Sequence, residues 1–154
     1  MYYNLLLIHS WFRWLVLCSL IYMIIRSYIG WKGNKTFTAS DNFLRHGTAT
    51  IAHIQLTIGL FLYFISPNVK YFLHHFKVAV HEKEPRFFGM EHSLMMVLAV
   101  VLITIGSVKA KRKESDQEKF KTIAFWFGIA LLVILSSLPW PWSPFSAHRP
   151  YFRF

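Results

Sequence analysis

Three histidines, His9, His53 and His92, lie inside long apolar segments and are the residues best placed for chemistry. An imidazole ring can ligate haem iron or another metal ion through a nitrogen, and it can also carry a proton near neutral pH. An ionisable side chain within hydrocarbon costs free energy, so such a residue in a membrane span is by default a candidate functional group. Because each histidine lies in a different segment, a shared site requires that the segments pack together.

The composition indicates that these segments cross a lipid bilayer. The chain has 154 residues, of which 55% are hydrophobic and 18% aromatic, which is more apolar than a soluble domain of this length. A helix that crosses about 30 Å of hydrocarbon needs about 20 predominantly apolar residues. Four segments meet this requirement, at about residues 4–28, 43–65, 87–108 and 122–138. The sequence therefore predicts a single all-α domain, residues 1–154, built as a four-helix transmembrane bundle of up-down order.

Local signals mark the ends of these helices. Ser40 and Asp41 are predicted N-caps of the second helix, and Pro67 is expected to end it. Pro85 suits the first turn of the third helix, and Pro139 prevents the fourth from continuing. The polar and aromatic segment 68–86 between the second and third helices is expected to lie as an amphipathic stretch on the outer surface.

The basic residues predict the orientation in the membrane. The formal net charge is +10, and the lysines and arginines lie almost wholly between the apolar segments. Ten of them fall in segments 26–45 and 109–121, whereas six fall in segment 67–88 and the C-terminal tail. The positive-inside rule therefore favours both termini on the outer side. Lipid headgroups and topology account for this charge, so no nucleic-acid partner is expected.

Depth along the helices ranks the three histidines. With a rise of 1.5 Å per residue, His9 lies about 8 Å and His92 about 10 Å from the outer end, and His53 lies about 20 Å from it. Two imidazoles that ligate one haem must lie at matched depth on different helices. His9 and His92 are therefore the predicted axial pair. His53 with His92 is the rival pair, because their helices are neighbours in sequence and helix tilt could absorb the difference.

Two charged residues accompany the predicted pair. Arg13 lies one turn from His9 on the same face and suits an anion such as a haem propionate or Glu91. Glu91 adjoins His92 and could orient its imidazole or handle protons at a quinone. The alternative is that Arg13 and Glu91 pair with each other or extend to the membrane interface. Cys18 is the only cysteine, so any haem must be held without covalent attachment.

The surroundings of His53 also carry polar and small residues. Gln55 and Thr57 add polarity beside it, and Gly47 and Gly59 permit close approach of another helix or a flat cofactor. A second haem near the inner side would need a second histidine there, which the third and fourth helices do not offer. One haem per chain is therefore expected, unless two chains share a second one.

Four short stretches together resemble a known family of membrane proteins. They are residues 9–14 (HSWFRW), 52–56 (AHIQL), 91–96 (EHSLMM) and 138–141 (LPWP). In this combination the chain resembles the small four-helix integral-membrane cytochrome b-like proteins, with the bundle architecture of the b561 type. The resemblance implies non-covalent binding of haem b and electron transfer in the membrane. The b561 type has two pairs of helix-borne histidines, and this sequence departs from that pattern.

Three functions compete at this point. The first is a haem b protein of the bacterial inner membrane that exchanges electrons with a quinone and a redox partner protein. The second is a cofactor-free structural or accessory subunit of a respiratory or other membrane complex. The third is a membrane enzyme or a copper-handling assembly factor that uses the same histidines. The sequence favours an electron-transfer protein or a subunit over a stand-alone enzyme, and it predicts no catalytic residue.

Overall fold

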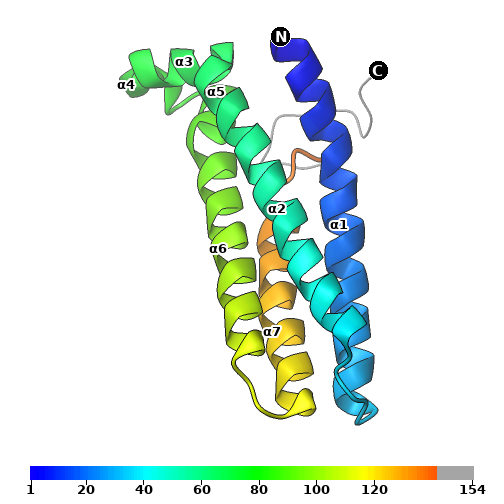
Figure 1. Ribbon diagram of the computed structural model, residues 1–154. Helices are drawn as coiled ribbons and strands as arrows, with labels where there is room; N and C mark the ends of the chain where they lie inside the picture. Colours follow the sequence, from blue (N-terminus) through cyan, green and yellow to red (C-terminus); the bar gives the residue numbers. More distant parts are fainter. Residues whose placement is uncertain (142–154) are drawn as a thin grey trace.

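The computed structural model, which describes residues 1–141, is a bundle of four long helices (Figure 1). They are α1 (Tyr2–Lys32), α2 (Ala39–Ile65), α6 (His92–Lys111) and α7 (Asp116–Ser136). Every regular element of the described residues is helical, which confirms the all-α prediction. Successive long helices run in opposite directions, and both α1 and α6 pack against α2 and α7. Hence α1 and α6 are parallel and lie on a diagonal of the bundle.

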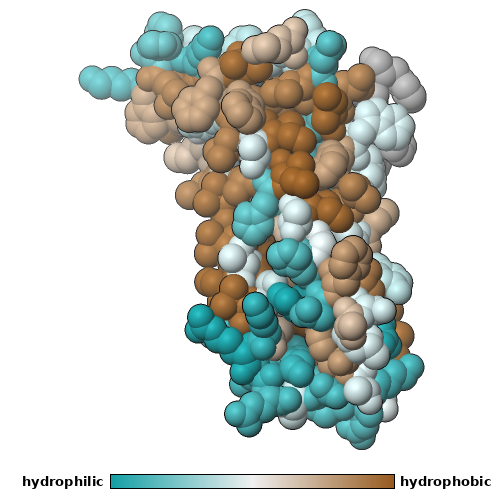
Figure 2. Space-filling model, viewed as in Figure 1, coloured by the Kyte–Doolittle hydropathy of each residue, from teal (hydrophilic) through white to brown (hydrophobic). Residues whose placement is uncertain are grey.

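Each long helix is long and apolar enough to cross a membrane, the third one counted from Lys83 to Lys111. On the face shown in Figure 2, apolar side chains cover much of the bundle on both sides of a band of hydrophilic and neutral ones, and hydrophilic side chains gather at the end with the α1–α2 and α6–α7 connections. We call this the loop end. The opposite end, with the first residue of α1 and the segment between α2 and α6, is the cap end (Figure 1). Residues 142–154 lie outside the described part, and the location of both termini on the outer side of the membrane stays a prediction.

The helix boundaries differ from the predicted ones by a few residues. Helix α1 runs past the expected residue 28 to Lys32, and α7 occupies 116–136 where 122–138 was expected. The hydroxyl oxygen of Ser115 accepts a bond from the backbone N–H of Glu118, so α7 begins in the polar connection rather than at the apolar segment. It ends three residues before Pro139, because a residue that precedes proline disfavours the helical conformation.

The N-cap of α2 is Thr38, and the prediction of Ser40 or Asp41 was wrong. The Thr38 hydroxyl accepts from the Asp41 N–H at 3.3 Å, and the Asp41 carboxylate accepts from the Thr38 N–H at 2.9 Å. This reciprocal capping box places Asp41 three residues inside the helix. The same carboxylate forms an ion pair with Arg26 at 2.7 Å and so joins α1 to α2 at the loop end.

The segment between α2 and α6 folds across the cap end. Helix α2 ends at Ile65, as predicted, and Pro67 begins α3 (Pro67–His74), which is followed by α4 (Phe76–Ala79) and α5 (Lys83–Arg86). One face of this segment is buried through Phe72, while other side chains remain exposed, as an amphipathic stretch requires. The Tyr71 hydroxyl donates to Glu82 at 2.9 Å and ties α3 to the residue before α5.

A single π-helical turn, η1 (Phe87–Glu91), joins α5 to α6. Gly89 in this turn lies against Phe72, and a Cβ there would come within 2.4 Å of the Phe72 ring. The Tyr63 hydroxyl donates to the Gly89 carbonyl oxygen at 2.9 Å. A π turn carries one more residue than an α turn, so it changes the direction of the side chains on either side of it. It therefore sets how His92, the next residue, faces the bundle.

The two halves of the bundle are packed differently. The largest fully buried apolar side chains of α1, α6 and α7 gather toward the loop end; they are Leu20, Met23, Ile103, Phe120, Ile123 and Phe127. Gly106 lets α6 approach Trp126 of α7, where a Cβ would come within 2.4 Å of that side chain. The core is thus closed in the loop half, and space between the helices is left in the cap half.

Candidate functional site

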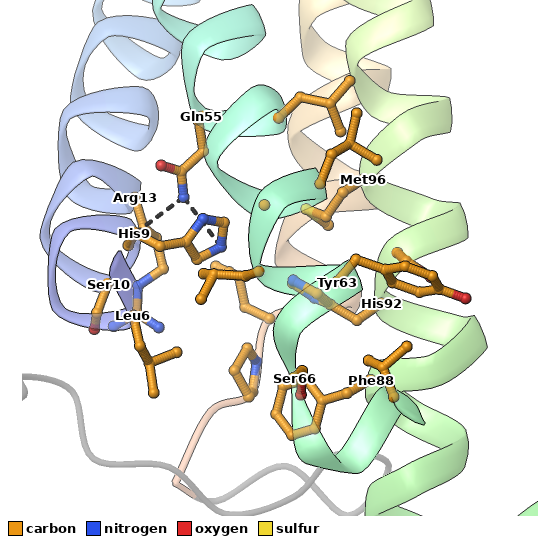
Figure 3. A pocket seen from close by; sticks show the side chains of 18 of the residues that line it. Leu6, His9, Ser10, Arg13, Gln55, Tyr63, Ser66, Phe88, His92 and Met96 are labelled. Atoms are coloured by element: carbon orange, nitrogen blue, oxygen red, sulfur yellow. Dashed lines mark hydrogen bonds between the residues drawn. The ribbon is translucent and has the colours of Figure 1, made fainter. Parts of the chain in front are cut away.

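A cavity of about 350 Å³ occupies the cap half of the bundle, between the four long helices (Figure 3). This volume lies at the lower end of the range of roughly 300–1,000 Å³ that is usual for small-molecule and cofactor sites. Its wall is mainly apolar, and a few polar groups interrupt it. The polar lining residues of the long helices are Tyr2, Tyr3, His9, Ser10, Arg13, Gln55, Tyr63, His92 and Ser93. This is the composition typical of a ligand site.

His9 and His92 point into this cavity from opposite sides (Figure 3). They come from α1 and α6, the parallel helices on the diagonal, so the cavity lies between the two imidazoles. Depth counting placed these residues at one level, and the structure brings both to the same space. Their action as ligands stays a prediction.

The backbone at the end of α7 fixes the tautomer of His92. Its Nδ1 lies 2.8 Å from the carbonyl oxygen of Ser137, the C-cap of α7. A carbonyl can only accept, so Nδ1 carries the proton and the lone pair is on Nε2. The ring also packs against Phe87, with the centroids 5.6 Å apart. His92 therefore has a fixed orientation and presents the nitrogen that metal-binding histidines commonly use, with the other ring nitrogen held by a carbonyl.

His9 is held by Gln55 of α2. The Gln55 side-chain nitrogen donates to the His9 backbone carbonyl oxygen at 3.0 Å and lies 3.3 Å from Nε2 of the ring. Among the described residues, the solvent-shielded Nδ1 of His9 and Oε1 of Gln55 have no hydrogen-bond partner. Most buried polar atoms in native proteins do have partners. Both atoms belong to residues that line the cavity, where they leave hydrogen-bonding or ligating capacity unused.

Gly59 completes the seat of His9. A Cβ at this position would lie 3.1 Å from Cε1 of the His9 ring, so glycine leaves the space that the imidazole occupies. The prediction that Gln55 and Gly59 surround His53 was wrong, because both contact His9 instead. The close approach of another helix that was predicted at Gly59 is confirmed, by His9 of α1. Residues 55 and 59 share one helical face, and His53 lies on another. At Gly47 a Cβ would meet nothing within 4 Å, so no close approach within the chain requires that glycine.

His53 lies outside the cavity on the exposed surface of α2. Its Nδ1 is 2.7 Å from the Ala49 carbonyl oxygen, and its Nε2 is 3.2 Å from the Thr104 hydroxyl of α6. The structure thus does not bring the rival pair, His53 and His92, to one site. Thr57 likewise faces outward and donates to the His53 carbonyl oxygen.

The two predicted charged residues separate. Arg13 lines the cavity, and its guanidinium carbon lies 5.3 Å from the centre of the Trp14 ring. Glu91 is not among the lining residues that the structure describes, and its carboxylate pairs with Nε of Arg86 at 2.8 Å. Arg13 is therefore the positive charge of the candidate site, while Glu91 joins the π turn to the end of α5.

Sequence reasoning missed three contributors to this geometry. Tyr63 holds the π turn from α2, and a tyrosine in an apolar helix does signal that its hydroxyl needs a partner. The π turn itself has no comparable signal in the sequence. The third contributor is the carbonyl of Ser137, a backbone group that becomes an acceptor for His92 because α7 ends there.

In residues 1–141 no three or more histidine, cysteine, aspartate or glutamate side chains are grouped as ligands of one metal ion. Comparison with known proteins gives no match, whether with protein-family models, curated proteins or solved structures. The candidate site therefore rests on the geometry of the cavity and on the chemistry of its two imidazoles.

Proposed function

We propose that this protein is a membrane cytochrome that holds one haem b without covalent attachment between His9 and His92 and transfers electrons. One observation carries the proposal: two imidazoles on diagonal, parallel helices face a single cavity from opposite sides. Helical bundles commonly build cofactor sites from inward side chains on facing helices, and paired axial side chains are a common way to hold haem iron.

The residues around the cavity fit this group. Nε2 of His92 carries a lone pair, and the His9 ring has a shielded nitrogen with no partner among the described residues. The contact between the Gln55 side-chain nitrogen and Nε2 of His9 is long, at 3.3 Å. Nε2 could therefore bind a metal while Gln55 keeps its bond to the His9 backbone carbonyl oxygen. Gly59 leaves room for the His9 ring beside α2.

Bound haem would supply a one-electron redox centre. The chain's own residues bind it and orient it. The Ser137 carbonyl and the Gln55 amide orient the two imidazoles, and a carbonyl partner on the non-ligating nitrogen makes an imidazole a stronger ligand. Arg13 provides a positive charge for a propionate. The closed core of the loop half keeps water from reaching the site from that side.

The proposal includes a location and partners. With the basic loop end inside, the cavity lies in the outer half of a bacterial inner membrane, and both termini are outside. Tyr2 of α1 and Asn68 of α3 also line the cavity, so it extends to the cap end. This supports electron exchange between a membrane quinone and a redox protein at the outer surface.

The experiment is an absorption spectrum of the purified protein from cells supplied with haem. We expect a reduced-minus-oxidised α-band of b type, which is lost in His9→Ala and in His92→Ala. His53→Ala is the matched control, because His53 is also in a span but outside the cavity, and it should retain the band. A folded, colourless protein would refute the proposal and favour a cofactor-free subunit. Loss of haem in His53→Ala, with haem retained in His9→Ala and His92→Ala, would show that His9 and His92 are not the ligands.

A further inference from the structure

A polar stripe runs along the outer face of α2, formed by His46, Thr50, His53 and Thr57. Their spacing of four, three and four residues places them on one side of the helix, and all four are exposed. Figure 2 shows hydrophilic and neutral side chains along α2 between hydrophobic ones. Ionisable residues within membrane spans almost always face protein or a water-filled cavity rather than lipid. An exposed histidine in mid-span thus marks a surface that another protein segment covers.

The contacts within the chain leave the stripe with unused hydrogen-bonding capacity. Nδ1 of His53 is close to the Ala49 carbonyl oxygen, Nε2 is close to the Thr104 hydroxyl, and that hydroxyl lies 2.7 Å from the Val100 carbonyl oxygen. These are three contacts, but a neutral imidazole and one hydroxyl supply only two hydrogens. With the Thr104 hydroxyl donating to the Val100 carbonyl oxygen and Nδ1–H donating to that of Ala49, Nε2 of His53 keeps a lone pair that can accept a bond from outside.

We propose that the stripe is the interface at which α2 packs against α2 of a second copy of this chain. Copies inserted in the same orientation are related by a twofold axis along the membrane normal, so each residue faces its own counterpart at equal depth. Such an interface requires side chains that can bond to their own kind. The histidine rings can donate and accept. The hydroxyls of Thr50 and Thr57 donate to the carbonyl oxygens of His46 and His53, and each can accept a further bond. A stripe of lysines or of glutamates would instead repel itself.

The flanks of the stripe suit this arrangement. At Gly47, beside His46, the space within the chain is open, so a second helix can approach its backbone. Phe43 and Phe61, 75% and 63% exposed, lie toward the two ends of α2 and provide apolar contacts around the polar centre. Gln55 and Gly59, which form the seat of His9, face the cavity. The dimer therefore does not depend on haem binding, and the two have separate readouts.

Disulfide cross-linking in native membranes tests the interface. In a Cys18→Ala background, Thr50→Cys and Thr57→Cys place a thiol on the stripe, and Leu132→Cys places one on the lipid-facing side of α7, where Leu132 is 68% exposed. Oxidation should give a band at twice the chain mass of 18.2 kDa for the two stripe positions and none for Leu132→Cys. Equal cross-linking at all three positions, no cross-linking at any, or a product with a different protein would overturn the proposal.

The mass of the protein in lipid nanodiscs gives a second measurement. The wild-type protein should be dimeric, and the triple variant Thr50→Val, His53→Leu, Thr57→Val should be monomeric with unchanged helical circular dichroism. Leu132→Ala is the control and should stay dimeric. A monomeric wild-type protein contradicts the interface even if haem is bound, and a dimer without haem supports it. If the triple variant does not fold, the cross-linking result decides.

Discussion

Gln55 of α2 binds the backbone of His9 in α1, through a bond of 3.0 Å from its side-chain nitrogen to the His9 carbonyl oxygen. A helical carbonyl has two lone pairs, so it can accept this bond in addition to the one along the helix. The bond joins two long helices at the depth of the cavity. The position of the His9 imidazole is therefore set by α2 as well as by α1.

Replacement of Gln55 should weaken the site without removing a ligand. In Gln55→Leu the bond to His9 is lost, and we expect haem affinity to fall on the order of 10-fold or more, the usual result when a residue that orients a metal ligand is removed. Haem titration of the apoprotein measures this. Gln117→Leu, at the other glutamine, lies at the loop end and should leave affinity unchanged. Equal affinities of wild type and Gln55→Leu would show that α1 alone positions the ring.

An alanine at position 59 should affect stability and haem binding in opposite directions. Alanine in a helix interior is favoured over glycine by about 0.5–1 kcal/mol, but its Cβ would lie 3.1 Å from the His9 ring. Gly59→Ala should therefore bind haem less tightly while the apoprotein unfolds at the same or a higher denaturant concentration. Gly128→Ala meets nothing within 4 Å and should keep full affinity. If both variants bind haem with the same affinity, the contact between Gly59 and the His9 ring does not affect haem binding.

Arg13 should tune the redox potential of the bound group. Loss of a positive charge beside a redox centre makes its reduction less favourable, and at protein dielectric this is on the order of tens of mV. Arg13→Leu should lower the midpoint potential. Arg13→Lys keeps the positive charge, so its potential should stay close to that of the wild-type protein. Lys70→Leu removes an exposed cation at the cap end that does not line the cavity, and it serves as the control. If the midpoint potential is the same in all three variants, the charge of Arg13 does not act on the bound group.

Asp41 should contribute to stability more than an ordinary surface acid. Its side chain is 1% exposed, completes the capping box of α2 and pairs with Arg26. Asp41→Ala should lower the free energy of unfolding by about 2–3 kcal/mol, because a cap and a charged hydrogen bond are both lost. Asp116→Ala, which removes a partly exposed pair with Lys119, should change it by less than about 1 kcal/mol. Unfolding in detergent by increasing denaturant compares them, and similar losses would contradict this role.

The cap end should respond to alkaline pH through Tyr71. Its hydroxyl donates to Glu82, and this bond to a carboxylate raises the pKa of the phenol above its usual value of about 10. The protonated phenol is favoured in the folded state, so the contact is complete at neutral pH and is lost as pH rises through the raised pKa. Absorbance titration of wild type against Tyr71→Phe isolates this phenol. In Glu82→Gln the Tyr71 phenol should ionise at lower pH. An unchanged titration of Tyr71 in this variant would show that Glu82 does not raise its pKa.

The length and spacing of the apolar segments predicted the four helices, and prolines predicted where two of them end. These features act through backbone geometry and through the thickness of the bilayer, both of which can be counted along a chain. The same counting placed His9 and His92 at one depth. The rotation of each helix about its axis could not be obtained in this way, because lipid and protein interior are both apolar and the pattern does not distinguish the inward face.

Tertiary packing decided that rotation. It turned Gln55 and Gly59 toward His9, left His53 on the surface, and brought the carbonyl of Ser137 to His92. The π turn before His92 depends on the contact of Gly89 with Phe72 and on the bond from Tyr63, which are distant in sequence. The sequence by itself determined which histidines share a level in the membrane. Only contacts between helices determined which of them share a cavity.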